Sequence, residues 1–115
     1  MTVTVSDGPA IVAGYDYTLQ IETDVATFPV GCALTAHVRA KVSDNAVLAT
    51  LTTANGSLTR ITDTVLEIAI PAPATAALQV GSVVLDVVRT DLELDRHLNF
   101  HLEIPVIKPV TRGLG

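Results

Sequence analysis

The sequence predicts an all-β fold: an antiparallel, immunoglobulin-like β-sandwich of about seven to nine short strands, with one short helical turn and extended termini. Apolar residues make up 49% of the chain and aromatic residues only 3%, so Val, Leu, Ile and Ala dominate, and the β-branched residues among them favour pleated sheet. Short segments also alternate apolar and polar residues. Gly, Pro, Asn and Asp separate these segments at regular intervals. The 115 residues fit one domain, residues 1–115.

In the N-terminal half, the clearest alternation lies in residues 15–22, where Tyr17, Leu19 and Ile21 point to one face. Residues 34–41 repeat this pattern and predict a second half-buried strand. Weaker signals predict strands over residues 10–13 and 47–53, and residues 1–5 as a short edge strand or an arm.

Residues 73–91 contain the most hydrophobic predicted strand. Thr75 is expected to cap a short helical turn, and Gly81 to end it. Residues 83–88 then form a strand that is apolar on both faces, which predicts a central position in a sheet. Further strands are expected over residues 58–62, 65–70 and 97–104, with residues 105–115 as an extended arm because Pro105 and Pro109 interrupt pairing.

The composition excludes several classes of function. A net charge of −5 and the absence of Trp disfavour nucleic-acid binding. No apolar run reaches the roughly 18 residues of a membrane span, and residues 1–9 do not resemble a signal peptide. We therefore expect folding in a cytoplasm, with no nucleic-acid or membrane partner. Cys32 is alone, which excludes a disulfide framework.

Apolar content is high for a small domain. The mean hydropathy is +0.48, and only 17% of residues are charged, against about 25% in typical domains. Either the core is tightly packed, or part of the apolar surface is covered by a partner or by further copies of the chain. We favour the second account and expect a homo-oligomer or a multi-copy assembly.

The strongest candidate for chemistry is the row His97, Asn99, His101 and Glu103 on one strand face. On a regular strand His97 and His101 lie about 13 Å apart, so they cannot share one metal ion unless the strand is broken. His37 projects outward from a strand that could lie beside this one. We interpret the row as a polar face exposed to solvent or to another subunit.

Three acidic residues, Asp91, Glu93 and Asp95, alternate as in a calcium loop but lack its glycine and closing Glu. Asp86 is the one charge in the apolar strand, and we expect it at the sheet surface or paired with a basic neighbour. Cys32 is expected to be a small core residue. The sequence therefore predicts no enzyme, no cofactor and no metal site.

Five motifs follow one another along residues 18–112. They are, in order, LTAHVRA, VLATLTTANGSL, LEIAIPAPATAALQVG, SVVLDVVRTD and LEIPVIKPVTR. This order resembles small virion proteins of tailed bacteriophages, in particular the immunoglobulin-like N-terminal domain of baseplate upper proteins. Two departures from that pattern are Val83 at an aromatic position and the absence of Gly from the reversal at residues 92–95.

The resemblance implies a non-enzymatic structural subunit that is made in the host bacterial cytoplasm and resides in the virion. It would dock to other phage virion proteins, either as a capsid decoration or cement protein or as a tail or baseplate adaptor. The alternative is a receptor- or carbohydrate-binding module of a tail fibre. The residues expected at protein interfaces are Val84, Val88, Val106, Ile107, Val110, Thr111 and Arg112.

Overall fold

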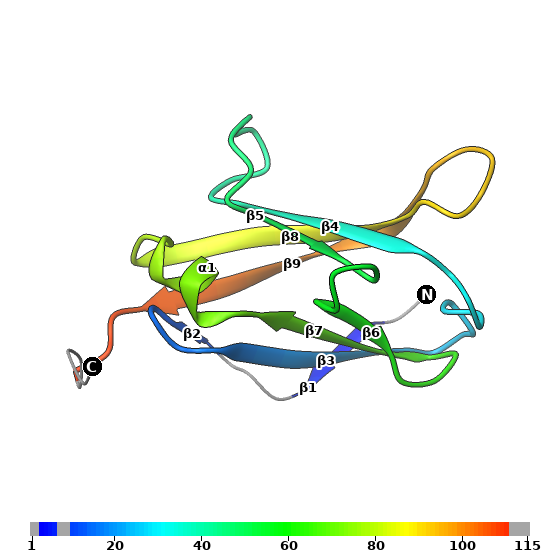
Figure 1. Cartoon of the computed structure of the whole chain (residues 1–115), viewed down its shortest axis with the longest axis horizontal. Coiled ribbons are helices and arrows are strands. Elements are labelled where there is room, and N and C mark those ends of the chain that lie inside the picture. The colour runs from blue at the N-terminus through cyan, green and yellow to red at the C-terminus, as the bar shows by residue number, and fades with distance from the viewer. Residues whose placement is uncertain (1–2, 7–9, 111–115) are drawn as a thin grey trace.

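Two β-sheets face each other in this computed structural model, which describes residues 3–6 and 10–110 (Figure 1). One sheet has the strand order β1-β3-β7-β6 and the other β2-β9-β8-β4-β5. The four-stranded sheet contains β1 (Val3–Ser6), β3 (Tyr17–Thr23), β7 (Val65–Ile70) and β6 (Leu58–Arg60). The five-stranded sheet contains β2 (Ile11–Val12), β9 (Arg96–Ile107), β8 (Gly81–Arg89), β4 (Leu34–Arg39) and β5 (Ala49–Thr52).

The predicted all-β sandwich is confirmed. With the strands lettered A, A′, B, C, C′, D, E, F and G in chain order, one sheet is A-B-E-D and the other A′-G-F-C-C′. This is the arrangement of an immunoglobulin sandwich. β8 lies between β9 and β4, which confirms its predicted central position. One of its apolar faces is buried in the core, whereas the other is the outer face of the sheet, where Val84 and Val88 are half-buried.

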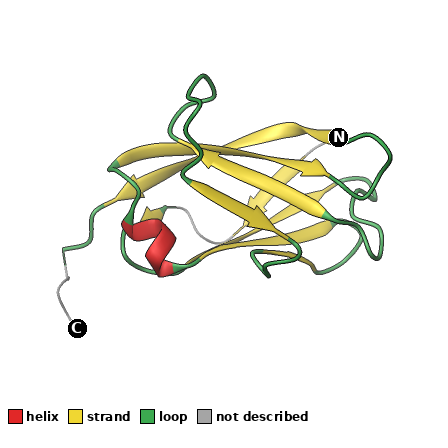
Figure 2. Ribbon diagram, turned by 45° about the horizontal axis from the view of Figure 1, so that its top comes forward, coloured by secondary structure: helices red, strands yellow, loops and turns green. Residues whose placement is uncertain are grey.

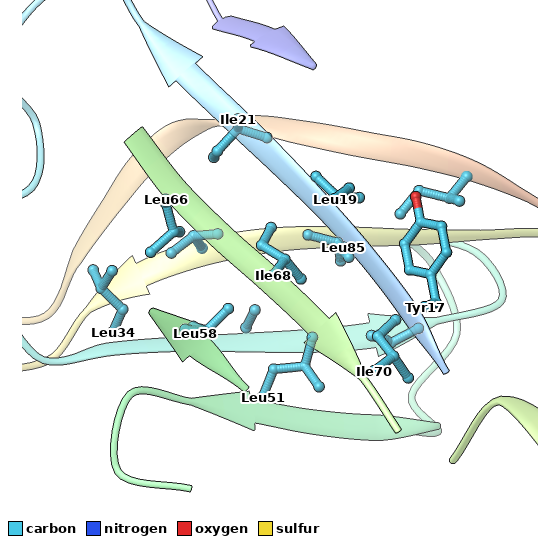
Figure 3. Close-up of a cluster of buried hydrophobic side chains, with 14 of the residues drawn as sticks. Tyr17, Leu19, Ile21, Leu34, Leu51, Leu58, Leu66, Ile68, Ile70 and Leu85 are labelled. Atoms are coloured by element: carbon cyan, nitrogen blue, oxygen red, sulfur yellow. The ribbon is translucent and has the colours of Figure 1, made fainter. Parts of the chain in front are cut away.

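The core lies between the sheets and follows the predicted alternation. In β3 the buried positions are Tyr17, Leu19, Ile21 and Thr23, and the residues between them are more exposed. Leu34, Ala36 and Val38 of β4, and Val83, Leu85 and Val87 of β8, are buried in the same way. Figure 3 shows this cluster, in which side chains of the two sheets meet at Leu19, Ile68 and Leu85.

One strand pair differs from the predicted antiparallel pattern. After β1, which pairs with β3 in the four-stranded sheet, the chain passes to the other sheet, where β2 pairs with β9 in parallel. Ile11 is fully buried beside Val106. The N-terminal segment thus provides an edge strand to both sheets, β1 to the four-stranded sheet and β2 to the five-stranded sheet. Short local sequence patterns do not reveal such a change of sheet.

The expected arm over residues 105–115 is wrong at its start. Pro105, Val106 and Ile107 belong to β9, and Val106 is only 1% exposed. Proline is tolerated at position 105 because, on the side away from β8, β9 pairs only with the two residues of β2 in the described part of the chain. Few backbone hydrogen bonds on that side therefore depend on the N–H that proline lacks. At the other terminus, β1 takes up Val3–Ser6 as an edge strand; residues 1–2 and 111–115 lie outside the described residues.

The helical turn is also placed differently from the prediction. Helix α1 (Ala72–Ala76) has Pro71 as its N-cap, whose side chain cannot cap it. The carboxylate of Asp16 accepts the N–H of Ala72 at 2.7 Å instead. Thr75 therefore lies inside the helix and is fully buried. The helix ends at Ala76, before Gly81, which instead begins β8 with φ +139°. Figure 2 shows α1 at the end of the sandwich where β9 ends.

Candidate functional site

The outer face of the five-stranded sheet carries the most organised group of polar side chains in the described part of the chain. Register places His37 of β4 and His101 of β9 on either side of Asp86 of β8. The next row holds Arg39, Val84 and Glu103 in the same strand order. We call these six residues the outer-face cluster. His37, Arg39, Val84, Asp86 and His101 line a hollow in this face, together with Val42 and Leu85.

A bulge in β9 adds the third histidine of the chain to Asp86. From His97 to His101, β9 advances four residues while β8 advances only two, from Val88 to Asp86. The two extra residues include Asn99, whose φ is +64°. As a result, the Nε2 atom of His97 lies 2.7 Å from Oδ2 of Asp86. The regular strand expected for residues 97–104 is therefore interrupted. His97 bonds the carboxylate of Asp86, and His37 and His101 are the neighbours of Asp86 in strand register.

The hydrogen bonds determine which nitrogen of His97 carries the proton. The backbone N–H of Asn99 donates to Nδ1 of His97 at 2.8 Å, so Nδ1 must be the acceptor. In the neutral ring, Nε2 then carries the proton and donates it to Asp86. The imidazole therefore connects the bulge of β9 to the centre of β8.

Arg39 holds the connection between β4 and β5 against this face. Its guanidinium donates to the carbonyl oxygens of Asp44 at 3.2 Å and Asn45 at 2.7 Å. It also lies 3.4 Å from Nδ1 of His37, which acts as the acceptor because arginine only donates. Val42 in the same connection is 74% exposed. The rim of the hollow thus carries an exposed apolar side chain on an anchored loop.

The predicted interface residues fall into three groups. Val84 and Val88 lie half-buried on the outer face, and Ile107 is exposed at its edge. Val110 is 97% exposed beyond β9. The prediction is wrong for Val106, because its side chain is buried in the core and cannot contact a partner protein. The remaining two, Thr111 and Arg112, lie outside the described residues.

The other candidates for chemistry have structural roles in the described residues. Arg89 binds Asp91 through two hydrogen bonds of 2.9 Å, which lower the pKa of Asp91 to about 2. Cys32 is buried, and its burial raises the pKa of the thiol, which is the reverse of an activated nucleophile. Within the described ranges, no group of three or more His, Cys, Asp or Glu side chains is placed to hold a metal ion.

Sequence reasoning found the members of this cluster but not their association. It noted that the strand of His37 could lie beside that of His101, whereas β8 separates the two strands. Asp86 was recognised as unusual, but its partner His97 is reached only through the bulge. The one local signal was the placement of a carboxylate and histidines on outward-facing strand positions.

No model of a known protein family matches the chain, and a search of curated proteins finds no match either. None of the helices in the described residues is long and apolar enough to cross a membrane.

Proposed function

We propose that this protein is a non-enzymatic structural subunit of a tailed-phage particle that docks to neighbouring virion proteins. It acts either as a capsid decoration or cement protein or as an adaptor in the tail or baseplate. The protein is made in the cytoplasm of the host bacterium and resides in the virion. The order of motifs along residues 18–112 supports this proposal.

The observation that carries the proposal is the exposure of large apolar side chains in several separate places. Val30 is 84% exposed in the connection between β3 and β4, and Leu94 is 81% exposed in the connection between β8 and β9. Both connections lie at the end of the sandwich opposite α1 (Figure 1). Val42 and Val110 are exposed elsewhere. A subunit that meets several neighbours would cover such residues in the assembled particle.

The alternative, a receptor- or carbohydrate-binding module, has less support. Sugar rings are commonly bound by exposed aromatic side chains, which combine an apolar ring with a polar edge. Among the exposed large hydrophobic residues in the described part of the chain, Tyr15 is the one aromatic residue. The exposed aliphatic residues favour packing against another protein.

The proposal is tested on phage particles purified from the bacterium that carries this gene. Quantitative mass spectrometry should find the chain in many copies per particle, at a constant ratio to the major capsid or tail protein. Absence from intact particles, or trace amounts that vary between preparations, would overturn the proposal. Separating heads from tails before the measurement distinguishes decoration from a tail or baseplate role.

A further inference from the structure

We infer that the outer face of the five-stranded sheet is a self-complementary interface, at which two copies of this chain pair face to face about a two-fold axis that runs along β8. The inference rests on the proposed function in treating this face as an assembly surface. It adds to that function by naming one neighbour of the subunit, a second copy of the same chain.

The row of Arg39, Val84 and Glu103 has the charge distribution that such a pair requires. Arg39 lies beside Val84 on one side, and Glu103 lies beside it on the other. Neighbouring strands are about 4.8 Å apart, so the two charged residues are separated by about 10 Å across the sheet. A cation and an anion thus flank a half-buried apolar residue on the central strand.

A two-fold axis along β8 exchanges the two flanks of this row. When a second copy is placed face down on the first, its β9 lies over β4 and its β4 lies over β9. Arg39 of each copy then faces the partner's Glu103, and the contact occurs twice because the interface is isologous. Val84 meets the partner's Val84 on the axis. An axis across the strands would instead place Arg39 against the partner's Arg39.

The adjacent rows are compatible with the same axis. Val88 meets the partner's Val88, which adds apolar contact along β8. Asp86 approaches the partner's Asp86, and each carboxylate is already engaged by His97 of its own chain at 2.7 Å. This hydrogen bond offsets part of the repulsion between the two carboxylates. The face of the other sheet has a cross-strand Gln20–Glu67 pair rather than opposite charges around an apolar centre.

The size of the face predicts a weak dimer. Five strands about 4.8 Å apart are about 19 Å wide, and the nine residues of β8 extend about 30 Å. The resulting roughly 570 Å² is an upper bound, because β2 and β5 have only two and four residues and the connection between β4 and β5 stands above the face (Figure 1). It is below the roughly 800 Å² that each partner buries in a standard stable interface. We therefore expect association that depends on concentration.

The experiment is a charge exchange followed by sedimentation velocity over a range of protein concentrations. The wild-type chain should pass from monomer to dimer as its concentration rises. Glu103→Arg should weaken the dimer by at least about tenfold, because two like-charged pairs replace two opposite ones. The double variant Arg39→Glu/Glu103→Arg re-forms both pairs with reversed signs and should recover part of the dimerisation that Glu103→Arg loses, although it lacks the anchors of Arg39 to Asp44 and Asn45.

The matched control is Glu67→Arg, which makes the same charge change on the outer face of the four-stranded sheet and should leave the dimer intact. Arg39→Glu alone also removes the anchors to Asp44 and Asn45, so a second decisive variant is Val84→Arg, which places two cations on the axis. Circular dichroism melts establish that each variant is folded. Val84→Arg should be a folded monomer.

A wild-type chain that stays monomeric at every concentration overturns the inference. So does a dimer, trimer or hexamer that is unaffected by Glu103→Arg and Val84→Arg in folded protein. In that case the subunit can still be found in phage particles, and the proposed function stands. Conversely, if the dimer responds to the charge exchange as expected but the protein is absent from phage particles, the interface is supported and the proposed function is overturned.

Discussion

At the scale of single residues, Thr75 connects helix α1 to the start of β3. Its hydroxyl donates to the carbonyl oxygen of Tyr15 at 2.7 Å and accepts the backbone N–H of Gly14 at 3.1 Å. Gly14 has φ +90°, so the segment turns sharply where it meets the helix. The side chain is fully buried. One hydroxyl therefore bonds two backbone groups of the turn.

Thr75→Val should lower the free energy of unfolding by about 1–3 kcal/mol. Valine has nearly the same shape but leaves the N–H of Gly14 and the carbonyl of Tyr15 without this partner. Urea titration of the purified chain measures the change. The control is Thr59→Val at an exposed position of β6, which should change stability by less than about 0.5 kcal/mol. Equal effects of the two substitutions would contradict this role for Thr75.

At the scale of elements, the bulge shapes both the face and the edge of β9. On the side away from β8, β2 pairs only with Val106 and Ile107 among the described residues. Much of a long strand is thus left at the edge of the sheet, where it could pair with another chain. The bulge at Asn99 and the proline at position 105 interrupt that edge. This favours contact through the face of the sheet rather than through its edge.

Substitutions at Asn99 test the bulge. Asn99→Gly should change the free energy of unfolding by less than about 0.5 kcal/mol, because glycine readily adopts φ +64°. Asn99→Val should destabilise by about 1–3 kcal/mol, because a β-branched residue is strained at positive φ. Thermal melts of both variants give the comparison. If valine is tolerated as well as glycine, the bulge does not have this conformation in solution.

At the scale of the whole molecule, the C-terminal part of β9 completes the sandwich. Val106 is buried beside Ile11, and the N–H of Ala13 donates to the carbonyl oxygen of Ile107 at 2.9 Å. These contacts join β2 to the end of β9 in the five-stranded sheet. Lys108, Pro109 and Val110 follow the last strand, and Val110 is almost fully exposed.

Two truncations separate this part of the core from the tail. A chain that ends at Ile107 should keep its fold and nearly all of its stability. A chain that ends at Ile104 should lose at least about 3 kcal/mol of unfolding free energy, because it loses the buried Val106 and uncovers Ile11. Thermal melts followed by circular dichroism measure both. Similar melting temperatures for the two truncations would place Val106 outside the core.

Much of the architecture could be predicted from the sequence. The period-two alternation in β3 placed Tyr17, Leu19 and Ile21 on one face, and the structure buries that face. This works because successive strand residues point to opposite sides, so one short segment is enough to assign its faces. For the candidate site, the same reasoning placed Val84 and Asp86 together on the face of β8 away from Leu85.

Only the tertiary structure decided which strands are neighbours and where their register shifts. The parallel pairing of β2 with β9, the burial of Val106 and the bond between His97 and Asp86 join residues far apart in the chain. A local pattern carries no information on such partners, because each depends on how two distant strands align and where a bulge adds residues. The faces of the strands follow from the sequence, whereas the outer-face cluster exists only through strand pairing.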